Sequence, residues 1–67
     1  MKVSARNQLK GRVTRVQLGS VMAEVEVDVG GQPVVSVITK ASAEAMRLAA
    51  GDDVVVIIKS TEVMIGK

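Results

Sequence analysis

The sequence predicts an all-β fold with one short helix, and three observations support this prediction. Ala23–Val29 alternates strictly between apolar and acidic residues, as a half-buried strand does. Gly30-Gly31 follows and can adopt the positive φ angles of a hairpin turn, so the chain can return as a second strand. Val54–Ile58 is an unbroken apolar run of five β-branched residues, whose stiff rotamers suit a pleated sheet.

The first strand is predicted near the N-terminus, in a segment that continues through Arg12–Leu18 with loose alternation before Gly19. We expect this strand to be roughly four to twelve residues long and to bend or bulge near Gly11. Pro33 stands at the start of the return strand Val34–Ile38, where a missing amide hydrogen costs least.

A short helix is predicted over Ala41–Ala50, which is rich in alanine, methionine and leucine and pairs Glu44 with Arg47 at helical spacing. Ser42 is the expected N-cap of this helix. Gly51 is the expected stop at its C-terminal end.

About five strands result when the apolar segment Val63–Ile65 is interpreted as a closing strand, with the helix between the third and the fourth. This order is typical of a small five-stranded Greek-key barrel of the OB type, and we expect residues 1–67 to form a single domain. A core of this size is marginal alone, and the chain has no Cys for disulfides and no His for a structural metal. Val54–Ile58 should be buried on one face by the core and on the other by a neighbouring chain, so we expect self-association.

The composition excludes several classes of enzyme. Without Cys and His there can be no Ser-His-Asp triad, Cys-His pair or thiol redox centre, and the sequence has no P-loop motif. The acidic row Glu24, Glu26 and Asp28 is explained by strand alternation as a solvated face, without a metal or an acid-base pair. We therefore expect a protein that is not an enzyme and has no resident metal or cofactor.

No segment has the pattern of a secretory signal, which makes a cytoplasmic location the default expectation. The longest strongly apolar run, Val54–Ile58, is far shorter than the ~20 residues that a membrane-spanning helix requires. We therefore expect no association with a membrane.

The segment Ser4–Gly11 brings together a hydroxyl, a guanidinium, two amides and an ammonium beside a predicted strand. These groups are mainly hydrogen-bond donors, which a small oxyanion needs because each of its oxygens is an acceptor. The residues alone leave a second interpretation open, in which the segment is a solvated basic strand or loop.

Together with Thr39–Ser42, Lys59-Ser60-Thr61 and Val63–Ile65, this segment resembles the molbindin family, small molybdate-binding proteins built on the Mop or TOBE-type domain. The resemblance covers essentially the whole chain, with the motifs in the family's order. It implies a barrel of the OB type that binds molybdate or tungstate for intracellular storage or buffering. It also implies a hexamer, assembled as a trimer of dimers, with the anions held between subunits by hydrogen bonds and without direct coordination of a metal.

The resemblance assigns six anion contacts by their positions in these motifs. They supply two cations and four hydroxyls, namely Ser4, Arg6, Thr39, Ser42, Lys59 and Ser60. By the same resemblance, Ser4 and Arg6 of one subunit should face the other four residues from the dimer partner. The amides of Asn7 and Gln8 are candidate secondary anion contacts, although we favour a structural role for them in the bend before Leu9.

Two other interpretations remain. A basic OB-type module could bind single-stranded nucleic acid, but such surfaces use aromatic platforms worth roughly 1–3 kcal/mol per base, and this chain has no aromatic residue. The chain could also be a regulatory domain excised from a molybdate transporter ATPase or a transcription factor. The start at Met1 and the complete motif set favour an independent protein.

Overall fold

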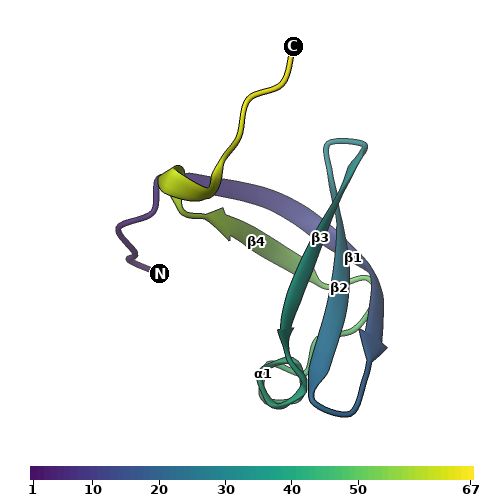
Figure 1. Cartoon of the computed structure of the whole chain (residues 1–67). Coiled ribbons are helices and arrows are strands. Elements are labelled where there is room, and N and C mark those ends of the chain that lie inside the picture. Colours follow the sequence, from purple (N-terminus) through teal and green to yellow (C-terminus); the bar gives the residue numbers. More distant parts are fainter.

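The computed structural model describes residues 1–67 as one antiparallel four-stranded sheet with a short α-helix and a 3-10 turn (Figure 1). In chain order the elements are β1 (Asn7–Leu18), β2 (Met22–Val29), β3 (Gln32–Thr39), α1 (Lys40–Ala45), β4 (Asp53–Ile58) and η1 (Ser60–Glu62). The spatial order of the strands is β3-β2-β1-β4, so β3 and β4 are the two edges. No helix in the chain has the length and apolar character needed to cross a bilayer.

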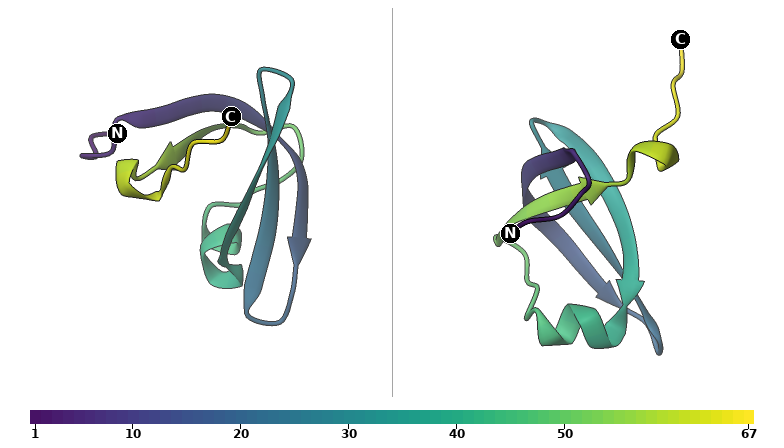
Figure 2. Two further views of the ribbon diagram at one scale, coloured as in Figure 1. Left: turned by 45° about the horizontal axis from the view of Figure 1, so that its top comes forward. Right: turned by 90° about the vertical axis from the view of Figure 1, so that its left-hand side faces the viewer.

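Strand β1 is long and bent, and it connects two limbs of the molecule. Its first half, Asn7–Arg12, pairs with β4, whereas its second half, Arg12–Leu18, pairs with β2. Figure 2 shows the β1–β4 limb lying across the limb formed by β1, β2 and β3. A Cβ atom on Gly11 would lie 2.6 Å from Cγ1 of Val27 and 2.7 Å from the carbonyl oxygen of Asp28. Glycine therefore allows β1 and β2 to approach closely at this point, and the bend predicted near Gly11 is confirmed.

The hairpin between β2 and β3 also has the predicted structure. Gly30 and Gly31 adopt φ angles of 57° and 88°, as a tight turn with two left-handed residues requires. Pro33 pairs with Asp28 near the start of β3, an edge strand where a residue without an amide hydrogen is tolerated.

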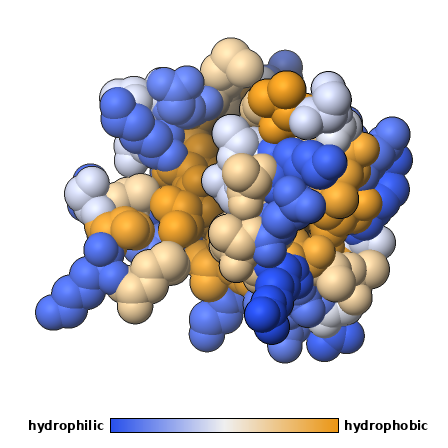
Figure 3. Space-filling view, turned by 90° about the horizontal axis from the view of Figure 1, so that it is seen from below, coloured by the Kyte–Doolittle hydropathy of each residue, from blue (hydrophilic) through white to orange (hydrophobic).

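The core is small and lies on the inner faces of β1 and β2. Val13, Val25 and Val27 form its centre, and Ala43 of α1 is buried at one end of the sheet. Only 5 of the 67 residues are buried, so much apolar surface stays exposed. Figure 3 shows orange hydrophobic surface interspersed with hydrophilic side chains over one face. This agrees with the expectation that the chain is marginally stable when alone.

The predicted ends of the helix were wrong at both termini. The N-cap is Thr39, and its hydroxyl accepts the backbone N–H of Ser42 at 3.0 Å, so Ser42 lies inside the helix. The helix ends before Arg47, whose φ angle is 52°. The N–H groups of Arg47 and Leu48 bond back to the carbonyls of Glu44 and Ala43, the pattern of a Schellman motif, and Gly51 plays no part in it.

The all-β, OB-like fold class is confirmed, but four strands are paired rather than about five. Val63–Ile65, the expected closing strand, follows η1 as an extended segment outside the sheet. The outward side chains of β4, Val55 and Ile57, are 39% and 41% exposed, so the second face of this apolar strand remains uncovered in a single chain.

Candidate anion-binding site

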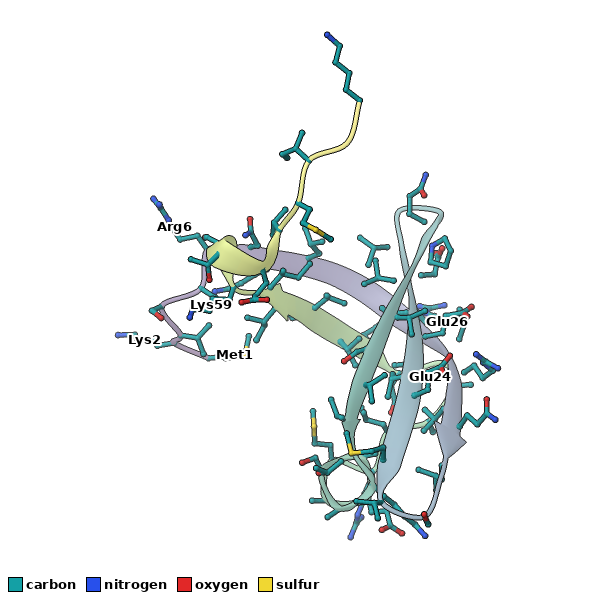
Figure 4. The ribbon with its side chains drawn as sticks, in the orientation of Figure 1. Met1, Lys2, Arg6, Glu24, Glu26 and Lys59 are labelled. Atoms are coloured by element: carbon teal, nitrogen blue, oxygen red, sulfur yellow. The ribbon has the colours of Figure 1, made fainter.

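Four of the six predicted contacts lie at one end of the β1–β4 limb. Asn7 is the first residue of β1 and is paired with Ile58, the last residue of β4. Arg6 and Lys59 are therefore neighbours just outside this pair, and Figure 4 shows them at the same end of the molecule. Ser4 and Ser60 lie one or two residues further along the chain from them. We call Ser4, Arg6, Lys59 and Ser60 the cationic end.

The charges of the cationic end are exposed and lie outside the ion pairs of the chain. The three ion pairs join Arg12 to Asp53 and Arg15 to Glu24 and Glu26, and neither Arg6 nor Lys59 takes part. Figure 4 also places Lys2 at this end, a third cation that was not among the six predicted contacts. Its only signal in the sequence was the group of cations near the N-terminus. Several cations without a carboxylate partner favour an anion as their counterpart.

The remaining two contacts, Thr39 and Ser42, lie together where β3 passes into α1. The Thr39 hydroxyl accepts the Ser42 backbone N–H and donates its own proton to Ser42 Oγ at 2.8 Å. The Ser42 hydroxyl is exposed and retains its proton for a further acceptor. We call Thr39 and Ser42 the hydroxyl pair. Both residues were predicted as ligands from their sequence positions, but the bonds between them were not predicted, although the capping spacing of three residues could have indicated them.

The two groups lie at opposite ends of the sheet in a single chain. Thr39 pairs with Met22 at the start of β2, and β2 is joined there to the end of β1, whereas the cationic end adjoins the start of β1. β1 spans 12 residues, and its path covers roughly 35 Å at ~3.3 Å per residue, although the bend shortens the direct distance. Hydrogen bonds extend only ~3 Å, so one bound anion cannot contact both groups of the same chain.

The fold therefore groups the six residues differently from the expected division between subunits. Lys59 and Ser60 lie on the side of Arg6, whereas the resemblance assigned them to the side of Thr39 and Ser42. The strand pairing that brings Lys59 next to Arg6 could not be read from the separate motifs.

The secondary candidates have different surroundings. The side-chain amide of Gln8 donates a hydrogen bond to the carbonyl oxygen of Ala5 at 2.8 Å, which holds the turn before β1. This contact agrees with the structural role favoured for Gln8. Asn7 begins β1 and is half-buried.

Two other features do not belong to this site. Glu24 and Glu26 lie on the outer face of β2, where the Arg15 guanidinium approaches both carboxylates at 2.9 and 3.9 Å. An open hollow lined by residues such as Lys10, Arg12 and Asp53 contains none of the six predicted contacts. The predicted site is thus an exposed pair of surfaces and not a pocket of the single chain.

The sequence and the fold match known proteins along the whole chain. A family model described as the TOBE domain matches residues 3–65. A probable molybdenum-pterin-binding protein of Haemophilus influenzae is 46% identical over 67 residues, which are 98% of this chain and 97% of that protein. The solved structure of a molybdate-binding protein from Sporomusa ovata superposes with a TM-score of 0.95 at 37% identity and covers 100% of both chains.

The same domain also forms part of larger proteins. The molybdenum transport protein ModE of Azotobacter vinelandii is 46% identical over 66 residues, which are 97% of this chain but only 24% of that protein. With the matching family model, the full-length relative and the fold, these findings confirm the resemblance drawn from the motifs. The chain therefore belongs to the TOBE domain family, in the molbindin group of small Mop-like domains.

Proposed function

We propose that this protein binds molybdate or tungstate in sites shared between two copies of the chain, and that it stores or buffers the anion. In each site the cationic end of one copy, with Ser4, Arg6, Lys59 and Ser60, would face the hydroxyl pair, Thr39 and Ser42, of the other. The observation that carries this proposal is the separation of the two groups within one chain, because neither group alone surrounds an anion.

The chemistry of the two groups suits a tetrahedral dianion. Arg6 and Lys59 offset its two negative charges, and the hydroxyls of Ser4, Ser42 and Ser60 donate hydrogen bonds from several sides. Contact between two copies would remove water from these groups, and their attraction for the anion would increase in the less polar surroundings. The anion would be held by hydrogen bonds and ion pairs, without a resident cofactor or a direct bond from a side chain to the metal.

The names of the relatives mention two kinds of ligand, molybdate and molybdenum-pterin. A pterin is a flat conjugated ring system, and aromatic side chains are the usual platform for such rings. The chain has no Phe, Trp or Tyr, whereas its candidate contacts are all cations and hydroxyls. We therefore propose the free oxyanion as the ligand. The same lack of aromatic side chains argues against single-stranded nucleic acid as a ligand.

A dimer is the smallest assembly that would complete these sites. Two-fold symmetry would give two equivalent sites per dimer, since each copy contributes one cationic end and one hydroxyl pair. A hexamer built from three dimers, as the family resemblance implies, would contain the same sites. The proposed role is binding and storage in a cell interior rather than catalysis.

Isothermal titration calorimetry of the native assembly with molybdate, tungstate, sulfate and phosphate tests this function. We expect tight binding of molybdate and tungstate, with one site per chain if every shared site is filled. Absence of molybdate binding, or equal binding by a monomeric species, would overturn the proposal.

A further inference from the structure

Lys40 is a cation without a carboxylate partner, and it lies directly beside the hydroxyl pair. It is the first residue of α1 and follows Thr39, and its backbone N–H donates to the carbonyl oxygen of Val21 at 2.7 Å. The three ion pairs of the chain do not include Lys40, although Glu44 lies one turn further along α1. A cation at the start of a helix lies against the positive end of the helix dipole, and the first turn of α1 has no acid to offset it. The half-buried Lys40 side chain therefore needs a counter-charge from outside its own chain.

Glu62 is the only acidic residue at the cationic end, because residues 1–7 and 58–67 contain no other Asp or Glu. It is the last residue of η1, and its backbone N–H donates to the carbonyl oxygen of Lys59 at 2.9 Å. Its side chain is exposed and takes part in no ion pair of the chain. A carboxylate this close to an anion site repels the ligand unless a further cation offsets its charge. Glu62 therefore also needs a partner.

These two unpaired charges belong to different limbs of the molecule. Lys40 begins α1 where β3 ends, whereas Glu62 ends η1, which follows β4. Figure 1 shows η1 on the β1–β4 limb and α1 at the far end of the limb formed by β1, β2 and β3. An ion pair requires its charged atoms within about 4 Å of each other, so these two charges do not pair within one copy.

We propose that Lys40 of one copy forms an ion pair with Glu62 of the other copy beside each shared anion site. The inference rests on the proposed function, in which one anion contacts Ser60 of one copy and Ser42 of the other. Hydrogen bonds of ~3 Å from both hydroxyls to one anion would bring these two serines close together. Glu62 is two residues from Ser60 in the sequence. Lys40 is two residues from Ser42, and its flexible four-carbon stem gives the ammonium the reach to meet the carboxylate.

The ion pair has two consequences for the shared site. It offsets the one carboxylate at the cationic end, so this group no longer opposes a dianion. It also orients the two copies, since opposite charges that face each other set the register of an interface. Two-fold symmetry repeats the pair at the second site of the dimer. Lys40 and Glu62 are thus positioning residues, which hold the two halves of the site together without contacting the anion.

Carbodiimide cross-linking of the wild-type protein tests the contact directly. The reagent activates a carboxylate, and a neighbouring amine displaces the activating group to form an amide, so only groups in contact are joined. Isotope-labelled and unlabelled chains would be co-refolded and loaded with molybdate before treatment. We expect a covalent dimer on a denaturing gel, and a Lys40–Glu62 peptide that joins a labelled to an unlabelled chain. Lys10, another lysine outside the ion pairs, is the internal control and should give no product with Glu62. Absence of the Lys40–Glu62 peptide, or its formation within single chains, would overturn the proposal.

Charge exchange tests whether the contact holds the copies together. Lys40→Glu and Glu62→Lys would each place like charges opposite one another, and the double variant would restore the pair in the reverse order. Native mass spectrometry of mixed labelled and unlabelled assemblies measures how fast subunits exchange. We expect each single variant to exchange about tenfold faster than the wild type, and the double variant to exchange at nearly the wild-type rate.

Arg47→Glu combined with Glu62→Lys is the matched control for this experiment. Arg47 is also a cation outside the ion pairs, and it lies just beyond the other end of α1. This combination should exchange as fast as Glu62→Lys alone. Single variants that exchange at the wild-type rate, or a Lys40→Glu/Glu62→Lys variant that stays as fast as they are, would contradict the ion pair.

Molybdate calorimetry on the same proteins separates the two proposals. A wild-type assembly that gives the Lys40–Glu62 link but binds no molybdate would refute the function and leave the ion pair standing. Tight molybdate binding without the link would refute the ion pair and leave the function standing. Lys40→Gln tests an alternative role of this lysine: weaker molybdate binding with an unchanged exchange rate would make it an anion contact and contradict the ion pair.

Discussion

Asn7 and Ile58 are paired across β1 and β4, and this pairing fixes the position of the two cations in the candidate site. Arg6 and Lys59 are the next residues outward from the pair, so both leave the sheet at the same end. Like charges that lie near one another repel, and an anion between them relieves that repulsion. The cationic end is therefore suited to a ligand with two negative charges.

Arg6→Ala and Lys59→Ala should each weaken molybdate binding by about 2–5 kcal/mol, the range for removing one partner of a buried charged contact. Arg12→Ala is the matched control, because Arg12 is an exposed cation paired only with Asp53 at 3.5 Å. It should change binding by less than ~1 kcal/mol. Calorimetry on assemblies of verified mass measures all three, and a loss below about tenfold in both site variants would remove these residues from the site.

The bonds between Thr39 and Ser42 predict that their alanine variants will behave differently. Thr39→Ala removes the N-cap of α1 and should lower the free energy of unfolding by about 1 kcal/mol. Ser42→Ala keeps the cap and should change that free energy by less than ~0.5 kcal/mol. Both should weaken molybdate binding, whereas Thr39→Ser should retain both properties. Urea unfolding followed by far-UV circular dichroism is the suitable measurement, since the chain has no aromatic fluorophore. Equal stability losses in the two alanine variants would contradict the assigned cap.

Gly11→Ala should destabilise the fold by about 1–3 kcal/mol, because the added methyl group would overlap with Val27 and the backbone of Asp28. Gly66→Ala is the control, since a Cβ atom there meets no other atom within 4 Å. The same urea titration compares them. Wild-type stability in Gly11→Ala would mean that the close approach of β1 and β2 is not required for the bend.

The features that local sequence determines were predictable. Gly30-Gly31 and the alternation of Ala23–Val29 specified the hairpin, because turn chemistry and side-chain period act over a few residues. The end of α1 was not predictable, because Arg47 adopts a positive φ angle that favours glycine or asparagine. No local feature of the sequence marks Arg47 for this conformation. The helix was therefore predicted to stop at Gly51, four residues beyond Arg47.

The candidate site was likewise predictable only in part. The residue types in the motifs indicated an anion, but their grouping depends on strand pairs between distant parts of the chain, such as Asn7 with Ile58. The closing strand Val63–Ile65 failed to pair for a related reason: apolar patterning shows that a segment needs burial but does not specify which chain will bury it.

Sulfate should compete poorly with molybdate, because donors arranged around a larger anion would reach a smaller one through longer and weaker hydrogen bonds. Affinity for molybdate should also change little between about pH 6.5 and 8, since the chain has no histidine to titrate in that range. Competition calorimetry at several pH values checks both expectations. Equal affinity for sulfate would point to a general cationic patch instead of a shaped site.

Complementation between defective chains tests most directly whether two copies share each site. Arg6→Ala chains would be unfolded together with Ser42→Ala chains, co-refolded, and checked by native mass spectrometry for mixed dimers. A mixed dimer should contain one site with both lesions and one intact site, so tight molybdate binding should partly return. Arg6→Ala mixed with Lys59→Ala is the matched control, in which every site carries one lesion and binding should stay weak. Recovery in the control mixture, or verified mixed dimers of Arg6→Ala and Ser42→Ala without recovery, would contradict the shared site.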